Sequence, residues 1–292
     1  MIPFIHLGPV EIPTFGLMVA AAMVAAYYVL RADMARRGLA SKDSPTAEMF
    51  IAIPCLVGIA GAKIYHVLET PRELFANPIG LLFSRYGLAW FGGLIAGFAA
   101  FIWLARWYKI PLLEMFDAGS PAAALGYGIG RIGCLLSGDG DYGKPTSLPW
   151  GMSFPNGLVP TTQRVHPTPI YELIVACVIA WVLWRLGARQ IWHTAKRGPS
   201  TARPGASRKD KDAGRSAQDD GAAGGAGWVQ PGGVFAAYLV LTGVARFLVE
   251  FIRINPRSFF GLTNAQAASA LSVIAGAALW WHGVRGGKAD SA

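Results

Sequence analysis

The amino-acid sequence predicts an all-α, polytopic membrane protein with about seven transmembrane helices. Of its 292 residues, 53% are hydrophobic and only 15% are charged, whereas soluble domains usually carry about 25% charged residues. A transmembrane helix needs about 20 mostly apolar residues, and seven segments approach that length within what we interpret as a single membrane domain, residues 1–292. They are residues 13–31, 49–68, 88–105, 115–136, 169–186, 232–252 and 262–283.

The distribution of basic residues predicts an N-terminus outside the cell and a C-terminus in the cytoplasm. Between these segments, 17 Lys and Arg side chains fall on one side and six on the other, and the side richer in Lys and Arg is normally cytoplasmic. Residues 1–30 contain no Lys or Arg, so the first apolar run lacks the basic region that opens a secretory signal peptide. Topology therefore explains the net charge of +9, and we expect no nucleic-acid partner.

Two segments lie outside the predicted bundle. Residues 137–168 are polar and rich in turn-forming residues, and we expect a small extracytoplasmic cap there. Residues 194–227 contain no aromatic residue and no aliphatic residue larger than Ala, so they cannot bury enough surface to offset chain entropy. We interpret them as a disordered cytoplasmic loop insertion. The alternative is a basic arm that contacts anionic lipid headgroups.

The sequence indicates neither a metal site nor a cofactor. Asp139-x-Asp141 lacks the downstream Glu of a calcium loop. A Gly-x-Gly-x-x-Gly run at residues 128–133 lies inside an apolar segment, where small residues serve close helix packing. The three cysteines form no Cys-x-x-Cys pair and each lies in an apolar stretch, which excludes a disulfide framework; they are Cys55, Cys134 and Cys177.

Charged residues within the apolar segments point to an anion site near the outer leaflet. Arg246, Glu250 and Arg253 have the spacing i, i+4, i+7 of one helix face, near the outer end of the sixth segment. Arg131 lies near the outer end of the fourth. Intramembrane charges are costly and usually face the bundle interior or a wet cavity. Because Arg presents a planar fork that matches phosphate, we expect a phospholipid headgroup here; a structural Arg–Glu pair is the alternative.

Several motifs together resemble prolipoprotein diacylglyceryl transferase. The resemblance covers the whole chain except the 194–227 insertion, in matching order. The principal motifs are Gly130-Arg131-Ile132-Gly133, His166-Pro-x-x-x-Tyr171-Glu172 and Arg246-Phe-x-x-Glu250-Phe-x-Arg253. Shorter matches are Gly16-Leu-Met18, Gly61-Ala-Lys63, Asn77-Pro78 and Phe91-Gly92-Gly93-Leu94.

This resemblance implies an enzyme of the bacterial inner membrane that needs no cofactor. It would transfer the diacylglyceryl group of phosphatidylglycerol to the lipobox cysteine thiol in the signal peptide of a prolipoprotein. A thioether forms and glycerol phosphate is released. Arg131 and Arg246 would stabilise the departing phosphate, and a base must accept the thiol proton. Glu250 is one candidate, and Asp139, Asp141 and His166 are the others.

The resemblance also implies which residues form the site. We expect catalytic roles for Arg131, Arg246, Glu250, Asp139 and His166. We expect substrate-binding roles for Arg131, Arg246, Arg253, Lys63, Tyr171, Glu172, Gly92, Gly93 and Cys134.

The chain departs from the family pattern at several positions. The family commonly has Tyr where Phe15 stands, His where Phe91 stands, Asn where Cys134 stands and Glu where Asp139 stands. Phe15 and Phe91 lack a hydroxyl and an imidazole that could take part in proton transfer. A second hypothesis is therefore a non-catalytic or altered-substrate relative that binds or moves anionic phospholipid.

Overall fold

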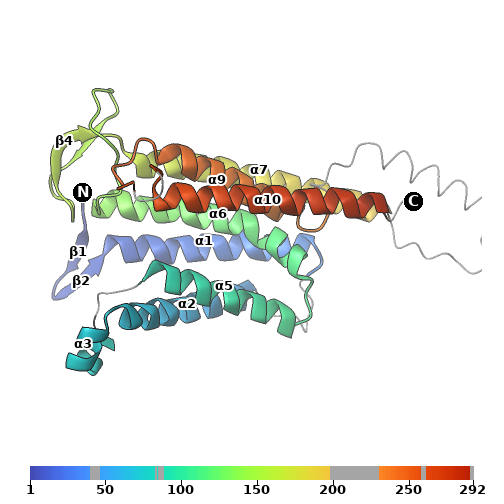
Figure 1. Ribbon diagram of the computed structural model, residues 1–292, viewed down its shortest axis with the longest axis horizontal. Coiled ribbons are helices and arrows are strands. Elements are labelled where there is room, and N and C mark those ends of the chain that lie inside the picture. The colour runs from blue at the N-terminus through green and yellow to red at the C-terminus, as the bar shows by residue number, and fades with distance from the viewer. Residues whose placement is uncertain (40–46, 83, 85–88, 198–229, 258–260, 290–292) are drawn as a thin grey trace, which may run out of the picture. The chain divides into compact units, whose positions relative to one another are not determined.

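The computed structural model describes residues 1–39, 47–82, 84, 89–197, 230–257 and 261–289 (Figure 1). The fold is mainly helical, as predicted, and each of the seven apolar segments coincides with one long helix. These helices are α1 (Thr14–Arg36), α2 (Ala47–Glu69), α5 (Trp90–Trp107), α6 (Leu112–Ser137), α7 (Thr168–Arg197), α9 (Gly233–Val249) and α10 (Asn264–Ala289).

Among the described residues, three helices are long and apolar enough to cross a membrane. They are α1, α2 and the part of α7 from Thr168 to Ile191. Two shorter apolar helices, Phe91–Trp107 and Gly233–Val249, accompany them. The number and lengths of these apolar helices are consistent with a membrane protein.

Several helix ends differ from the sequence prediction, and two of these differences affect the predicted site or the predicted loop. The sixth segment was expected to remain helical to residue 252, but α9 ends at Val249 and Glu250 is its C-cap. The predicted disordered segment begins within α7, which continues to Arg197 because Ala, Arg, Gln and Lys after residue 187 are good helix formers. Residues 198–227 of that segment lie outside the described residues.

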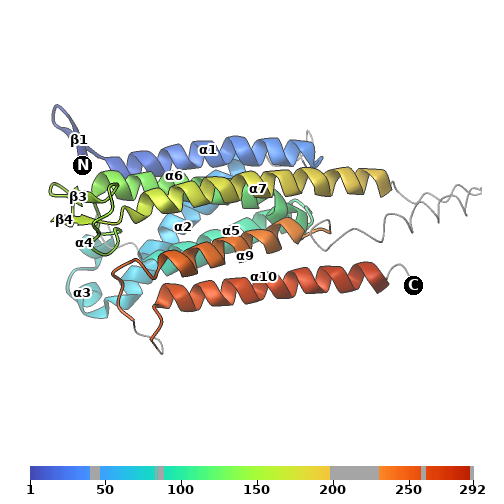
Figure 2. The same cartoon turned by 90° about the horizontal axis from the view of Figure 1, so that it is seen from above.

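The chain divides into two compact units, which we describe separately. Unit 1 comprises Met1–Ala26 and Phe116–Ala292, and unit 2 comprises Tyr27–Met115. In unit 1, α6, α7, α9 and α10 run side by side, with the short strands gathered at one end of these helices (Figures 1 and 2). Ala124 of α6, Ile179 and Leu183 of α7, and Val234 and Ala237 of α9 form a buried apolar cluster that joins the three helices.

The start of α9 is fixed by a buried carboxylate. Asp117 of α6 accepts hydrogen bonds from the backbone N–H groups of Gly232, at 2.8 Å, and Phe235, at 2.7 Å. The side-chain amide of Gln190 in α7 donates a third, at 2.8 Å. The first N–H groups of a helix have no partner within it and carry partial positive charge. Asp117 satisfies them and so ties three helices together.

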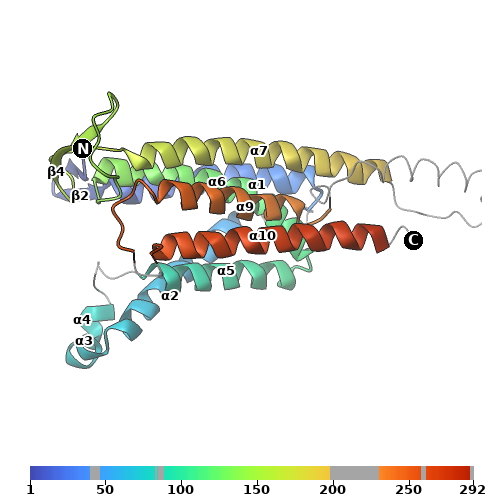
Figure 3. The same ribbon diagram turned by 45° about the horizontal axis from the view of Figure 1, so that its top comes forward.

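Four short strands, which the all-α prediction did not include, form two antiparallel hairpins. Strands β1 (Phe4–Leu7) and β2 (Val10–Pro13) pair before α1, and β3 (Met152–Phe154) pairs with β4 (Thr161–Val165) before α7. Both hairpins lie at the same end of unit 1 (Figure 3). Residues 137–168 therefore fold as a small β-containing segment, the cap, packed around Tyr142, Phe154 and Val165.

Backbone pairing joins the cap to the turn after α9. Gly143 bridges to Arg253, and the N–H of Lys144 donates to the carbonyl of Ile252 at 2.8 Å. On its other side, the N–H of Gly143 donates to the carbonyl of His166 at 2.8 Å. A Cβ atom at Gly143 would lie 2.7 Å from the Ile252 carbonyl oxygen. Glycine is therefore required for this close approach.

Unit 2 is built on the close packing of α2 against α5, with the short helices α3 (Pro71–Ala76) and α4 (Pro78–Leu82) between them in the chain. Gly58 and Gly61 of α2 face Gly93 and Gly92 of α5. A Cβ atom on Gly92 would lie 2.5 Å from the carbonyl oxygen of Gly61. Small residues let two helix backbones approach this closely within a membrane.

Candidate active site

Three arginines from two helices and a turn converge on one buried carboxylate in unit 1. Arg131 comes from α6, Arg246 from α9 and Arg253 from the turn after α9, and Glu172 lies in the first turns of α7. The distances from Glu172 oxygens to Nη1 atoms are 2.7 Å for Arg246, 3.3 Å for Arg131 and 3.5 Å for Arg253. The Glu172 side chain is only 5% exposed. It therefore lies at the centre of what we call the arginine cluster.

Asp141 is a second carboxylate of this cluster and connects it to the cap. Its two oxygens form ion pairs with Arg131 and Arg253, and its backbone carbonyl accepts a hydrogen bond from the hydroxyl of Thr168. Burial opposes the ionisation of Asp141, but the guanidinium groups of Arg253 and Arg131 outweigh this effect and hold its pKa below the ordinary value. Asp141 is therefore a charged anchor for two arginines.

Glu250 is the third carboxylate, and it is held from both sides. Nη2 of Arg246 lies 3.1 Å from its Oε2, and the side-chain amide of Asn255 donates to its Oε1. The i, i+4 prediction for Arg246 and Glu250 thus corresponds to a real ion pair. The prediction that Arg253 continues the same helix face is wrong, because the helix ends at Val249; the bridge to Gly143 brings Arg253 into the cluster instead.

The three arginines differ in how far solvent reaches them. The side chain of Arg253 is 6% exposed, whereas those of Arg131 and Arg246 are 19% and 28% exposed. Both pairs of Arg131 use Nη1 alone, which leaves Nε and Nη2 without a partner among the described residues. The guanidinium of Arg131 lies over the ring of Tyr127, 5.1 Å from its centroid. Arg131 and Arg246 can therefore meet an anion from outside, and Arg253 is an internal support.

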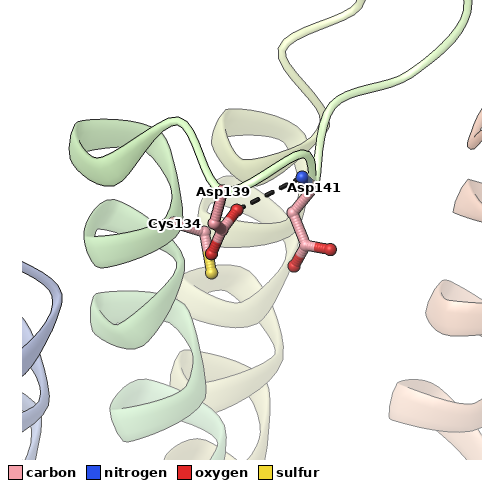
Figure 4. Close-up of side chains that lie close together, drawn as sticks. All are labelled: Cys134, Asp139 and Asp141. Atoms are coloured by element: carbon pink, nitrogen blue, oxygen red, sulfur yellow. Dashed lines mark hydrogen bonds between the residues drawn. The ribbon is translucent and has the colours of Figure 1, made fainter. Parts of the chain in front are cut away.

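Cys134 and Asp139 lie beside the cluster (Figure 4). The Cys134 sulfur and one carboxylate oxygen from each of Asp139 and Asp141 lie within 4.8 Å of one another. Asp139 accepts a hydrogen bond from the backbone N–H of Asp141 at 3.2 Å and forms no ion pair within the described part of the chain. Cys and Asp side chains can hold a metal ion, but the two guanidinium groups on Asp141 would repel a cation. We assign no metal here.

Three ring side chains of the cap and α7 form a separate cluster, which we call the ring trio. The indole N–H of Trp150 donates to the hydroxyl of Tyr171 at 2.8 Å. The same hydroxyl lies 3.2 Å from Nδ1 of His166. Of the predicted site residues, His166 and Tyr171 thus contact each other rather than the arginine cluster.

The other predicted substrate-binding residues belong to unit 2. Nζ of Lys63 donates to the carbonyl and the hydroxyl of Ser84, at 3.0 and 2.7 Å. Gly92 and Gly93 form the contact with α2 described above. These residues are not among those that unit 1 brings together, and the close packing of α2 and α5 explains the two glycines without a substrate.

Two residues of the cluster, Tyr127 and Asn255, were not predicted from the sequence. The hydroxyl of Tyr127 donates to Glu172 at 2.9 Å, and Asn255 supports Glu250. The sequence suggests Asp141 only as an alternative base, whereas the structure makes it an anchor for two arginines. The i, i+4 spacing of Tyr127 and Arg131 was a usable signal, whereas no local pattern marks Asn255.

Comparisons with known proteins agree with the resemblance seen in the sequence. Residues 3–201 and 225–282 match the model of a family described as prolipoprotein diacylglyceryl transferase. The chain is 29% identical to the phosphatidylglycerol–prolipoprotein diacylglyceryl transferase of Clostridium tetani, over 90% of this chain and 89% of the relative. It is 30% identical to the protein of the same name from Geobacter sulfurreducens, over 89% and 84%. The corresponding protein of Leptospira interrogans is 26% identical, over 92% and 81%.

Proposed function

Since the chain belongs to the prolipoprotein diacylglyceryl transferase family, we propose that it transfers the diacylglyceryl group of phosphatidylglycerol to the cysteine thiol of a prolipoprotein. The acceptor is the lipobox cysteine of the signal peptide. The products are a thioether and glycerol phosphate. This reaction is the first step of lipoprotein maturation.

One observation carries the proposal: Arg131 and Arg246 come from different helices, meet at Glu172 and remain partly exposed. A lipid phosphate that approaches them would meet two guanidinium forks that are already held in place. Arg suits this role because its planar donors bind phosphate oxygens in pairs. The carboxylates position the arginines, and the free Nε and Nη2 of Arg131 are the donors available to the lipid.

The chemistry follows from this charge layout. The thiolate sulfur attacks the glyceryl carbon that carries the phosphate ester. The C–S bond forms while the C–O bond to phosphate breaks, and glycerol phosphate leaves with the electron pair. Negative charge thus grows on the phosphate, where preorganised donors stabilise the transition state most.

The thiol proton needs an acceptor, and the geometry favours Asp139. Both oxygens of Asp141 are held by arginines. The Oε1 atom of Glu250 accepts the Asn255 amide, and its buried Oε2 is ion-paired with Arg246 at 3.1 Å without a hydrogen bond. Asp139 forms no ion pair among the described residues and is partly exposed. We propose that Asp139 accepts the proton, that Glu250 orients Arg246, and that His166 acts elsewhere.

We propose a seven-span arrangement in the bacterial inner membrane. The N-terminus and the cap would lie outside, and the C-terminus would lie in the cytoplasm, which places the arginine cluster at the outer leaflet. The distribution of 17 against six basic residues supports this orientation. Reporter fusions after Gly38 and after Ser200 should both give cytoplasmic signals, and a periplasmic signal at either would contradict it.

The second candidate function is phospholipid binding without transfer. Phe15 favours it, because it stands where the family commonly has Tyr and packs against Gly133 of α6, next to Cys134. Two departures from the family pattern therefore lie together beside Arg131.

Incubation of the purified protein with labelled phosphatidylglycerol and a lipobox peptide separates the two functions. Transfer predicts a labelled thioether peptide and an equal amount of glycerol phosphate. A lipobox peptide with Ser in place of Cys is the control and should gain no label. Lipid binding without a labelled peptide would favour the second candidate.

A further inference from the structure

The ring trio lies next to the arginine cluster in the chain at both of its anchor points. Tyr171 directly precedes Glu172, and neighbouring Cα atoms are about 3.8 Å apart. The backbone of His166 pairs with Gly143 and Lys144, two and three residues after Asp141. The trio and the cluster are therefore joined through short stretches of backbone at the same end of unit 1.

Hydrogen bonds within the trio orient its polar atoms but leave part of their hydrogen-bonding capacity unsatisfied. The Tyr171 hydroxyl accepts the indole N–H of Trp150 and lies beside Nδ1 of His166. On the far side of the half-buried imidazole, Nε2 has no partner within the described ranges. The indole of Trp150 is 56% exposed. The trio thus presents an aromatic face next to polar atoms that can donate or accept hydrogen bonds.

Hydrogen bonds from Arg164 fix the loop that carries Trp150. The guanidinium of Arg164 donates to the carbonyls of Pro149, at 2.8 Å, and Gly151, at 3.1 and 3.2 Å. These carbonyls flank Trp150 on both sides. An exposed Trp that is fixed by three hydrogen bonds to its neighbours is preorganised for contact, which lowers the entropy cost of binding.

We propose that the ring trio binds the terminal glycerol of the phosphatidylglycerol headgroup and so selects this lipid by its hydroxyl groups. This inference rests on the proposed function, which places the phosphate on Arg131 and Arg246. The glycerol extends beyond the phosphate, on the side away from the acyl chains. Its C–H groups suit an aromatic face, and its two hydroxyls suit His166 and Tyr171. A headgroup without hydroxyls would leave these polar atoms unpaired. A site that hydrogen-bonds a substrate hydroxyl discriminates against an analogue without it more strongly than an apolar pocket does.

The test compares two lipids of equal charge. Phosphatidylethanol has the same phosphodiester as phosphatidylglycerol but no headgroup hydroxyl. Native mass spectrometry of delipidated protein, with both lipids present at equal concentration and with equal acyl chains, gives the binding ratio without any need for turnover. The variants are Tyr171→Phe and His166→Ala. The control is Trp181→Phe, because Trp181 lies on the same helix α7 and is 60% exposed.

We expect the full-length wild-type protein to prefer phosphatidylglycerol, and each variant of the trio to reduce this preference by about two- to tenfold, as for the loss of one hydrogen bond. Binding of phosphatidylethanol and the Trp181→Phe ratio should not change. Equal binding of both lipids by the wild type would overturn the proposal. The proposal would also be overturned if the trio variants kept the wild-type lipid ratio but bound the lipobox peptide more weakly, because the trio would then bind the prolipoprotein instead of the lipid.

The failure of this proposal and of the proposed function can be told apart. A clear lipid preference without thioether product would contradict transfer and leave the glycerol site standing. Normal transfer without lipid preference would contradict the glycerol site alone.

Discussion

Replacing Glu172 by Gln would remove the central negative charge of the arginine cluster and keep the shape of the side chain. Three guanidinium groups there face three carboxylates, so the summed charge of these groups would change from zero to +1. The Glu172 side chain is 5% exposed, and solvent screens such a pair little. Loss of one partner from a buried ion pair costs about 3–5 kcal/mol. We expect the free energy of unfolding to fall by that amount.

The same change should strengthen the binding of an anion. One positive charge would lose its partner, so glycerol phosphate should bind more tightly to Glu172→Gln than to the wild type. Denaturant titration in detergent measures the unfolding free energy, and calorimetric titration measures glycerol phosphate binding. The matched control is Glu48→Gln, because the hydrogen bond of Glu48 with Tyr27 is exposed and such contacts contribute little. If both variants gave equal stability and unchanged anion binding, the charge balance argued for the cluster would be refuted.

Four further predictions follow from the site and the fold. Arg131→Lys should slow transfer by about 10²–10³-fold, the scale for one preorganised donor, with normal insertion; normal turnover would contradict the phosphate role. The pKa of Asp141 is lowered in the folded protein. Its stabilising effect should therefore be complete above the ordinary carboxyl range near pH 4 and disappear as the pH falls through the folded-state pKa. The measurement is the difference in unfolding free energy between the wild type and Asp141→Asn, and a difference that stays constant below about pH 4 would argue against this prediction. Gly92→Ala should disrupt the packing of α2 against α5 and lower the midpoint of thermal unfolding. Gly130→Ala is the control, because a Cβ there meets nothing within 4 Å. Equal midpoints for the two variants would contradict a packing role for Gly92. Deletion of residues 198–226 should leave transfer activity nearly unchanged, because doubling a loop length costs only about 0.6 kcal/mol; lost activity at normal expression would assign this segment to a lipid or partner.

The helices and part of the cluster could be predicted because they depend on local sequence. Apolar length alone located all seven long helices. The spacing of Arg246 and Glu250 predicted their contact, since residues four apart share a helix face. Arg131 stood out as a charge in an apolar segment, and such charges seldom occur without a partner.

The remaining contacts depend on chain reversals that local patterns do not determine. Gly138 and Gly140 adopt positive φ angles of 59° and 93°, and in the segment that they form Asp141, not Asp139, pairs with the arginines. Arg253 reaches Asp141 through the backbone bridge to Gly143, a contact between distant parts of the sequence. Neither outcome follows from spacing along the chain.

The ion pairs between distant parts of the chain bear on when the site can form during biosynthesis. Glu172 pairs with an arginine 74 residues further along, and Asp141 pairs with Arg253, 112 residues further along. During translation Glu172 is therefore made long before two of its three arginine partners, and Asp141 long before one of its two. A chain that stops before Arg246 would keep a surplus of negative charge at one end of the bundle, with only Arg131 to balance it. The charges of this site therefore balance only in a chain that extends past Arg253.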